Sequence, residues 1–267
     1  MKSRIILEIG YNHNGSIDLA QRMIEDASKL RVWGVKFQKW NFEGFPDDIK
    51  ALPREHRNSF GSTYYDHRKA LEFSIEELDR LRRFALSCGL EFVCSGKDAT
   101  SIKELVAMGC QNIKVPAQRF SDKEIFDLLK DSDARVMVST GMHADYEIQF
   151  SPWWGVADVV MHCISLYPAP LDSCCLSYMR KVAFNGYSSH ETEGRAIKYA
   201  VMLGANWIER HFTFDKAAKG SDHAISSDYE EIERIKNEIE EAEEIRGQDV
   251  RIVTAEEKKA YEFYGRF

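Results

Sequence analysis

Cysteine is scarce in this chain, with six residues among 267, and none of them shows the C-x-x-C spacing of a metal or redox site. Six thiols are also too few to hold a chain of this length together as a disulfide scaffold. Long apolar runs are absent as well, since no segment approaches the roughly 20 residues of a membrane span. The first residues, MKSRIILEIG, are too short and too soon polar for a signal peptide. We therefore expect a cytoplasmic protein with reduced thiols and no membrane association.

Positive charge is in deficit, because the formal net charge is −7. Binding to nucleic acid through counterion release needs a basic face, so nucleic acid is not expected as the main partner. A local group of lysines or arginines can still bind a small anion. The G-x-G-x-x-G motif is also missing after the first predicted strand, which argues against a dinucleotide-binding domain.

Short apolar segments alternate with longer amphipathic ones along the whole chain. We predict eight strands, over residues 5–10, 34–38, 91–95, 112–116, 135–140, 157–163, 183–188 and 207–211. Helices are predicted over residues 17–30, 74–88, 101–108, 122–129, 175–182, 192–203 and 228–247. Ser74 and Glu77 have the spacing of a capping box at the start of the second of these helices.

Strict alternation of strand and helix predicts a parallel sheet, and eight repeats favour closure into a barrel. The length is also close to the roughly 250 residues of one such barrel. We therefore predict an α/β protein with a single (β/α)8 TIM barrel over residues 1–249, followed by a C-terminal tail over residues 250–267. An open doubly wound sheet is the alternative. Residues 40–73 are too many for an ordinary connection, and we expect them to form a loop over the mouth of the barrel.

Two histidines follow neighbouring predicted strands near the end of the chain. His190 in GYSSHE and His211 in WIERHF are 21 residues apart, with one helix-length segment between them. This spacing predicts that both imidazoles lie at the C-terminal end of the barrel, where such barrels build active sites. Imidazole is the commonest protein ligand of a catalytic metal, so the pair is a candidate metal site.

Two lysines lie inside predicted strands, Lys36 in VKFQ and Lys114 in IKVP. An unpaired charge is costly to bury, so each lysine needs an anionic partner. That partner is either a carboxylate of the protein or a bound anion, and serine hydroxyls at the same rim favour a phosphate and a carboxylate.

The remaining histidines are less informative. We expect His13 to position a loop and His162 to be a hydrogen-bonded core residue. His56, His67 and His143 are expected to be solvated.

Nine motifs occur in the order in which the sialic acid synthase family carries them, and the chain resembles this family over residues 5–226. They are EIGYNHNG, VKFQ, ALEFS, IKVP, VSTGM, HCISLYPAP, GYSSHETEG, GANWIERHF and KGSDHAIS. The resemblance implies an enzyme that condenses phosphoenolpyruvate with the aldehyde of an open-chain aldose, giving a 2-keto-3-deoxy sugar acid and phosphate. It also implies a homodimer.

The same resemblance implies roles for matching positions. His190 and His211 would hold a divalent metal, Mn²⁺ or Mg²⁺, and with Lys36 and Lys114 would be the catalytic residues. The expected contacts of phosphoenolpyruvate are Lys36, Gln38, Ser95, Lys114, Ser139, Ser165 and Ser188. The expected contacts of the sugar acceptor are Asn14, Tyr167 and Asp222.

The chain departs from the family pattern at several positions. After IKVP the family has Ser-Gly-Glu, whereas this chain has Ala117, Gln118 and Arg119. Ser189 replaces an aspartate before the first metal histidine, and Lys97 lies in CSGKD, where the family has STPFD. We expect the barrel domain alone, without the C-terminal antifreeze-like domain that most members carry.

The added charges of Arg119 and Lys97 suggest an acceptor that bears an anionic group, because a guanidinium suits a carboxylate or phosphate. The alternative is that Arg119 pairs with Asp98 or Asp122 and that the acceptor is neutral. Two other functions also stay open. One is a Schiff-base aldolase with Lys36 or Lys114 as nucleophile. The other is a barrel that binds a sugar or a phosphorylated ligand without turning it over.

Overall fold

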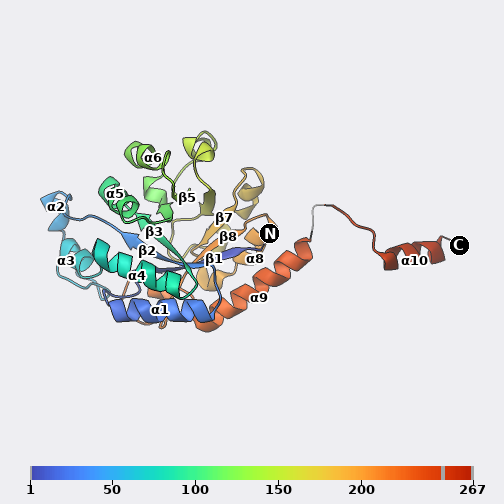
Figure 1. The fold of residues 1–267 in the computed structure, drawn as a ribbon, viewed down its shortest axis with the longest axis horizontal. Helices are drawn as coiled ribbons and strands as arrows, with labels where there is room; N and C mark the ends of the chain where they lie inside the picture. Colours follow the sequence, from blue (N-terminus) through green and yellow to red (C-terminus); the bar gives the residue numbers. More distant parts are fainter. Residues whose placement is uncertain (1, 248–249, 266–267) are drawn as a thin grey trace.

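The computed structural model describes residues 2–247 and 250–265, and it forms a closed barrel of eight parallel strands in sequence order (Figure 1). Pairing of the last strand with the first closes the barrel. The strands are β1 (Arg4–Gly10), β2 (Gly34–Lys39), β3 (Glu91–Gly96), β4 (Asn112–Val115), β5 (Arg135–Ser139), β6 (Val159–Cys163), β7 (Gly186–Ser189) and β8 (Trp207–His211). All eight predicted strands are present, and the predicted (β/α)8 barrel is confirmed.

Helices follow the strands and surround the barrel (Figure 1). The larger ones are α1 (Ile17–Lys29), α4 (Ile75–Ser87), α5 (Ala99–Ala107), α6 (Lys123–Leu129), α8 (Ile197–Met202) and α9 (Tyr229–Arg246). The predicted capping box is present, since Ser74 accepts a hydrogen bond from the amide of Glu77 and the Glu77 carboxylate accepts one from the amide of Ser74.

Two predicted helices are shorter than expected. Residues 175–182 contain only a 3-10 helix, η4 (Leu176–Arg180). Residues 192–203 are divided into a 3-10 turn, η5 (Thr192–Gly194), and the helix α8. The division lies at Glu193 and Gly194, which both have a positive φ (63° and 67°), so the backbone there cannot continue a right-handed helix.

The inside of the barrel is built in layers because alternate residues of a strand face the same side. An apolar layer closes one end, formed by Ile6, Val93, Met137, Val159, Met161 and Trp207. Two residues further along the same strands lie Glu8, Ser95, Ser139, Cys163 and Glu209, all buried. A polar layer therefore lies directly above the apolar one, toward the C-terminal ends of the strands. A larger apolar core fills the space between strands and helices.

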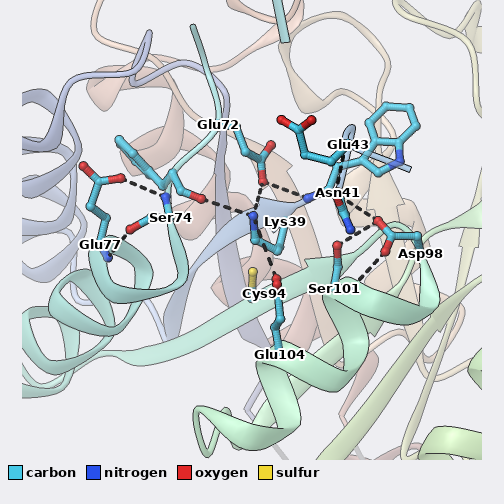
Figure 2. Close-up of polar contacts among 12 residues, drawn as sticks. Lys39, Asn41, Glu43, Glu72, Ser74, Glu77, Cys94, Asp98, Ser101 and Glu104 are labelled. Carbon is cyan, nitrogen blue, oxygen red and sulfur yellow. Dashed lines mark hydrogen bonds and ion pairs between the residues drawn. The ribbon is translucent and has the colours of Figure 1, made fainter. Parts of the chain in front are cut away.

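The long connection after β2 contains two short helices, α2 (Asp47–Lys50) and α3 (Tyr64–Lys69), and is tied to the barrel by carboxylates (Figure 2). Glu72 forms an ion pair with Lys39 at 3.2 Å and accepts a hydrogen bond from the amide of Trp40 at 2.8 Å. Asp98, the N-cap of α5, accepts from the amide of Asn41 at 2.8 Å. Both ends of the connection are therefore fixed at the C-terminal rim of the barrel.

The remaining α-helices of the described residues are α7 (Asp145–Gln149) and α10 (Ala255–Tyr264). The latter lies in the predicted tail, and its side chains are exposed along its whole length. Residues 248–249 and 266–267, at the predicted domain boundary and the end of the tail, lie outside the described residues. Within residues 2–247 and 250–265, no helix combines the length and the apolar character needed to cross a membrane.

Candidate active site

A pocket opens at the C-terminal ends of the strands, and every strand or the loop after it contributes to its lining. The polar lining residues are Glu8, Tyr11, Lys36, Gln38, Arg68, Ser95, Lys97, Lys114, Gln118, Ser139, Cys163, Ser165, Tyr167, Ser188, His190, Glu209, His211, Ser221 and Asp222. The predicted lysines, the two histidines, Gln38 and the four predicted serines are thus brought into one cavity, although they come from seven different strands and their loops.

The two buried lysines share carboxylates of the protein. Nζ of Lys36 lies 2.8 Å from Oε2 of Glu8 and 3.6 Å from Oε1 of Glu209. Nζ of Lys114 lies 2.7 Å from the same Glu209 oxygen. Both lysines and both glutamates are almost fully buried. The cost of burying each charge is therefore offset by an opposite charge within ion-pair distance.

This network also shifts the protonation of its members. Burial disfavours the charged form of Glu209, but Lys114 and Lys36 outweigh it and hold the pKa of that carboxyl below its usual range. Burial likewise acts against charging Lys36, yet Glu209 and Glu8 raise the pKa of its ammonium. Burial lowers the pKa of Lys114 despite the attraction of Glu209. At neutral pH Glu209 can therefore act as a counterion to both lysines.

Hydroxyl groups surround the lysines. The Oγ of Ser95 accepts a hydrogen bond from Lys36 at 3.1 Å, and Ser188 donates to Glu209 at 3.1 Å. The Oγ of Ser139 is buried and has no partner among the described residues, so its donor is available to a bound molecule. A Cβ at Gly141 would lie only 2.3 Å from the Oγ of Ser165, so a glycine is needed there to keep that serine in place.

The two predicted metal ligands face each other, with ring centroids 5.7 Å apart. The Nδ1 of His190 lies 2.7 Å from the carbonyl oxygen of Ile164, and a donated proton there leaves Nε2 as an acceptor, 3.5 Å from the Oγ of Ser188. The Nδ1 of His211 is buried and has no hydrogen-bond partner within the described part of the chain. Two neighbouring imidazoles therefore line the same pocket, and neither has a carboxylate as hydrogen-bond partner among the described residues.

Both histidines are held in the neutral form that binds metals. Burial, followed by the nearby His211, lowers the pKa of His190 to about 3. Burial also lowers the pKa of His211. The described residues contain no group of three or more His, Cys, Asp or Glu side chains placed to hold a metal. The pair fits a divalent ion with two protein ligands, which would leave open positions for water or substrate.

Tyr167 and Asp222, predicted to face the acceptor, both line the pocket next to the histidines. The ring of Tyr167 lies 4.3 Å from that of His190, and burial raises the pKa of its hydroxyl. Burial opposes ionisation of Asp222, but His211 and a hydrogen bond from Ser221 lower the pKa of its carboxyl. This side of the pocket therefore offers a neutral hydroxyl and a carboxylate to a polar ligand.

Two of the predicted substrate contacts are not among the residues that line the pocket. The side-chain oxygen of Asn14 lies 3.3 Å from Nε2 of His223 instead. Arg119 donates from Nε to the carbonyl oxygen of Lys97 at 2.7 Å and lies 3.7 Å from Asp122. Arg119 thus lies near Asp122, one of the two partners considered for it, and its contact with an anionic acceptor stays a prediction. Its guanidinium is used by the protein itself.

Sequence reasoning missed two charged residues of the pocket, Glu8 and Arg68, and it noted Glu209 at the end of its strand without assigning it to the lysines. Glu8 and Glu209 each interrupt an apolar strand, as Lys36 and Lys114 do, and that pattern could have identified them as partners of the lysines. Arg68 lies far from any strand in the long connection after β2, where the sequence offers no comparable signal.

The other histidines give a mixed result. His162 is a core residue whose Nε2 lies 2.8 Å from the carbonyl oxygen of Cys174, as predicted. His13 stacks on Phe73 and accepts a hydrogen bond from the amide of Gly15, which confirms its role in positioning a loop. The prediction for His67 is wrong, because this residue is buried and accepts a hydrogen bond from the amide of Phe60 at 3.1 Å.

Comparison with known proteins gives consistent results. The family model described as the NeuB family matches residues 23–251. An N,N'-diacetyllegionaminic acid synthase of Legionella pneumophila is 32% identical over 259 residues, which cover 91% of this chain and 73% of that protein. An N-acetylneuraminate-9-phosphate synthase of Drosophila melanogaster is 35% identical over 251 residues, which cover 88% of this chain and 66% of that protein.

Among solved structures, the N-acetylneuraminic acid synthetase of Leptospira borgpetersenii in complex with citrate superimposes with a TM-score of 0.85 at 26% identity. The match covers 99% of this chain and 92% of that chain. The expectations that the chain belongs to a family of synthases and is an enzyme are thus confirmed. From its motifs, its barrel and these relatives, the chain is a member of the NeuB family.

Proposed function

We propose that this protein condenses phosphoenolpyruvate with an open-chain aldose, such as an N-acyl amino sugar, to give a 2-keto-3-deoxy sugar acid and phosphate. Such a reaction belongs to the biosynthesis of sialic acids and related nonulosonates. The observation that supports it most is the buried polar layer at one end of the barrel, where two lysines, several serines and two neutral histidines share one pocket.

Phosphoenolpyruvate carries a phosphate and a carboxylate, and the pocket has charges and hydroxyls for both. Lys36 and Lys114 would supply the positive charges. The hydrogen-bonding groups around them would be Gln38, Ser95, Ser139, Ser165 and Ser188. Glu8 and Glu209 form ion pairs with these lysines, so they would hold the two ammonium groups in position for a bound anion. Buried charge-assisted contacts of this kind are about twice as strong as neutral ones.

His190 and His211 would hold the divalent metal, Mn²⁺ or Mg²⁺, through their imidazole nitrogens. When bound, such an ion polarises the aldehyde oxygen of the acceptor and makes its carbon more electrophilic. Tyr167 and Asp222 would orient the acceptor, because they line the pocket beside this histidine pair.

The atoms of the reaction balance without a protein nucleophile. C3 of phosphoenolpyruvate forms a bond to the aldehyde carbon, whose oxygen takes up a proton. Water then adds at C2, the C–O bond to phosphate breaks, and the ketone remains. The water gives up its protons in this step, and Glu8 and Glu209 are the carboxylates of the buried layer that can receive one. Each carboxylate has one oxygen, Oε2, that accepts no hydrogen bond from the described residues, so both are candidates for this role.

A phosphate-release assay with phosphoenolpyruvate, a divalent metal and a panel of aldoses tests this proposal, with mass spectrometry of the product. Phosphate release is expected only when an aldose is present, together with a product that contains the carbons of both substrates. Release of phosphate without an aldose, or no release with any aldose, would contradict it. We also expect a cytoplasmic homodimer, as the sequence suggested, and sedimentation analysis of the purified protein would test the dimer.

A Schiff-base aldolase is the second candidate, and the lowered pKa of Lys114, caused by burial, is the observation that favours it. Against it, Lys114 is bound to Glu209 at 2.7 Å, which holds the ammonium in place. Borohydride would trap the substrate on the protein if this mechanism operates, and chelators would leave turnover unchanged. A barrel that only binds a sugar or phosphorylated ligand would give neither trapping nor phosphate release.

A further inference from the structure

Arg68 is a buried cation whose hydrogen-bonding capacity is largely unused. Its side chain comes from α3 in the long connection after β2 and lines the pocket, yet the residue is only 8% exposed. Its Nε and Nη2 atoms are buried and have no hydrogen-bond partner among the residues that the structure describes. Leaving buried donors of a charged group unpaired is costly, so this arrangement suggests a ligand group that pairs with them.

Lys97 adds a second cation to the same part of the pocket. It follows β3 and lines the pocket, and no carboxylate of the described residues lies within ion-pair distance of its ammonium. Arg119 fixes the backbone of Lys97, because the Lys97 carbonyl oxygen accepts a hydrogen bond from its Nε. Burial and then the charge of Arg68 lower the pKa of Lys97 to about 7, and a bound anion would oppose both effects by favouring the charged form.

The same two aromatic rings contact both Arg68 and Lys97. The guanidinium carbon of Arg68 lies 4.0 Å from the centre of the Tyr11 ring and 5.1 Å from that of Trp40. The ammonium of Lys97 lies 5.3 Å and 5.0 Å from the same two rings. Cation–π contacts orient a cation but leave its N–H donors free. Both side chains are therefore positioned by rings and not by a direct carboxylate partner.

The rings themselves are fixed by the carboxylates shown in Figure 2. Glu72 accepts hydrogen bonds from the amide of Trp40 and, through its other oxygen, from the hydroxyl of Tyr11 at 3.2 Å. Asp98 holds the amide of Asn41 and also caps α5, the helix that follows Lys97. The segments that carry both cations and both rings are thus anchored to one rim of the barrel before any ligand binds.

Charge balance separates this pair from the lysines deeper in the pocket. Lys36 and Lys114 have Glu8 and Glu209 as direct partners, so that layer is already neutralised. Asp222 acts electrostatically on both Arg68 and Lys97, Glu72 also acts on Arg68, and Glu8 also acts on Lys97, but none of these carboxylates forms an ion pair with either cation among the described residues. The uncompensated positive charge of the pocket therefore lies at Arg68 and Lys97.

We infer that Arg68 and Lys97 form an anion subsite that selects acceptor aldoses carrying a phosphate or carboxylate group. This inference rests on the function proposed above and specifies its acceptor. Both cations lie within electrostatic reach of Asp222, a residue expected on the acceptor side of the pocket. Lys97 follows β3, the strand that carries Ser95, so the affinity for phosphoenolpyruvate has to be measured beside that for the acceptor. The fork of a guanidinium suits the two oxygens of such a group, and the ammonium adds a third contact.

Calorimetric titration with N-acetylmannosamine 6-phosphate and with N-acetylmannosamine measures this subsite without turnover. The unmodified protein is expected to bind the phosphorylated sugar at least about ten-fold more tightly, as a gained charge-assisted contact provides. Lys97→Gln and Arg68→Gln should each weaken binding of the phosphorylated sugar about ten-fold. The affinity of each variant for phosphoenolpyruvate should stay within about two-fold of that of the unmodified protein. Lys69→Gln, at the exposed neighbour of Arg68, is the matched control and should change neither.

Equal affinity of the unmodified protein for both sugars would overturn the inference. So would a loss of phosphoenolpyruvate affinity in Lys97→Gln as large as the loss for the sugar phosphate, because the subsite would then belong to phosphoenolpyruvate. If Arg68→Gln does not fold, the affinities of Arg68→Lys and Lys97→Gln for the phosphorylated sugar still test the subsite. Selective binding of the sugar phosphate without phosphate release from any aldose would leave the subsite standing and refute the proposed reaction.

Discussion

Lys114 and Glu209 meet across the barrel: Nζ of Lys114 on β4 lies 2.7 Å from Oε1 of Glu209 on β8, although three strands separate them on either side. The same oxygen lies 3.6 Å from the ammonium of Lys36 on β2. One carboxylate thus links two lysines from different parts of the barrel wall. A ligand that binds one lysine will therefore affect the other.

The histidine pair gives the first prediction. His190→Ala or His211→Ala should reduce the affinity for Mn²⁺ and the rate of phosphate release together, since each removes one of two imidazole ligands. Calorimetry with Mn²⁺ and circular dichroism of the metal-free proteins would measure binding and folding. His56→Ala, at an exposed histidine, is the control. Unchanged, chelator-sensitive turnover in the double variant would place the metal elsewhere.

Lys36→Ala should raise the KM for phosphoenolpyruvate. Loss of a buried charge-assisted contact costs about 1.5–3 kcal/mol, which corresponds to roughly 10- to 150-fold. Lys103→Ala removes an exposed lysine that pairs with Glu124 and should leave this KM unchanged. Steady-state kinetics at saturating aldose would measure both. An unaltered KM in Lys36→Ala would contradict the assignment of this lysine to the anion.

Glu209→Gln should lower the free energy of unfolding by about 3 kcal/mol or more at pH 7, because it leaves two buried lysines short of a counterion. The pKa of Glu209 is lowered in the folded state, so its stabilising effect is present above the ordinary pKa of 4.5 and is lost as pH falls through the folded value. The difference between the two proteins should therefore shrink below about pH 4.

Urea denaturation of both proteins over this pH range is the measurement. Glu124→Gln, which removes only an exposed ion pair, should change stability by less than about 1 kcal/mol. A pH-independent difference between Glu209→Gln and the unmodified protein would show that the ionised carboxylate is not what stabilises the layer.

Gly141→Ala should impair binding of phosphoenolpyruvate without unfolding the protein. The added Cβ would lie 2.3 Å from the Oγ of Ser165 and 2.8 Å from the Sγ of Cys163, so both side chains must move. We expect the KM for phosphoenolpyruvate to rise about ten-fold, because the loss of one hydrogen bond to the substrate costs about 1.4 kcal/mol. Gly155→Ala, where a Cβ meets nothing within 4 Å, is the matched control. Equal KM values for the two variants would exclude Ser165 from the binding site.

The sequence alone was sufficient for the barrel and for much of the pocket. The alternation of apolar and amphipathic segments is local information, and it predicted eight strands that the structure contains. Because alternate strand residues face the barrel interior, Lys36, Lys114, His190 and His211 could be placed at one end from their positions within or just after strands. Helix lengths were less predictable, since the positive φ of Glu193 and Gly194 that interrupts one helix has no clear signal in the pattern.

Only the tertiary structure decided which charges pair with which. Arg119 looked like an acceptor-binding residue, but its guanidinium binds the backbone of Lys97 and lies near Asp122. His67 looked solvated and is buried, whereas Arg68 beside it reaches the pocket from a long connection. The physical reason is the same in each case. Strand periodicity determines the direction of a side chain within its own element, but its partners come from elements distant in sequence, and for a charged group those partners decide whether it is free to bind a ligand.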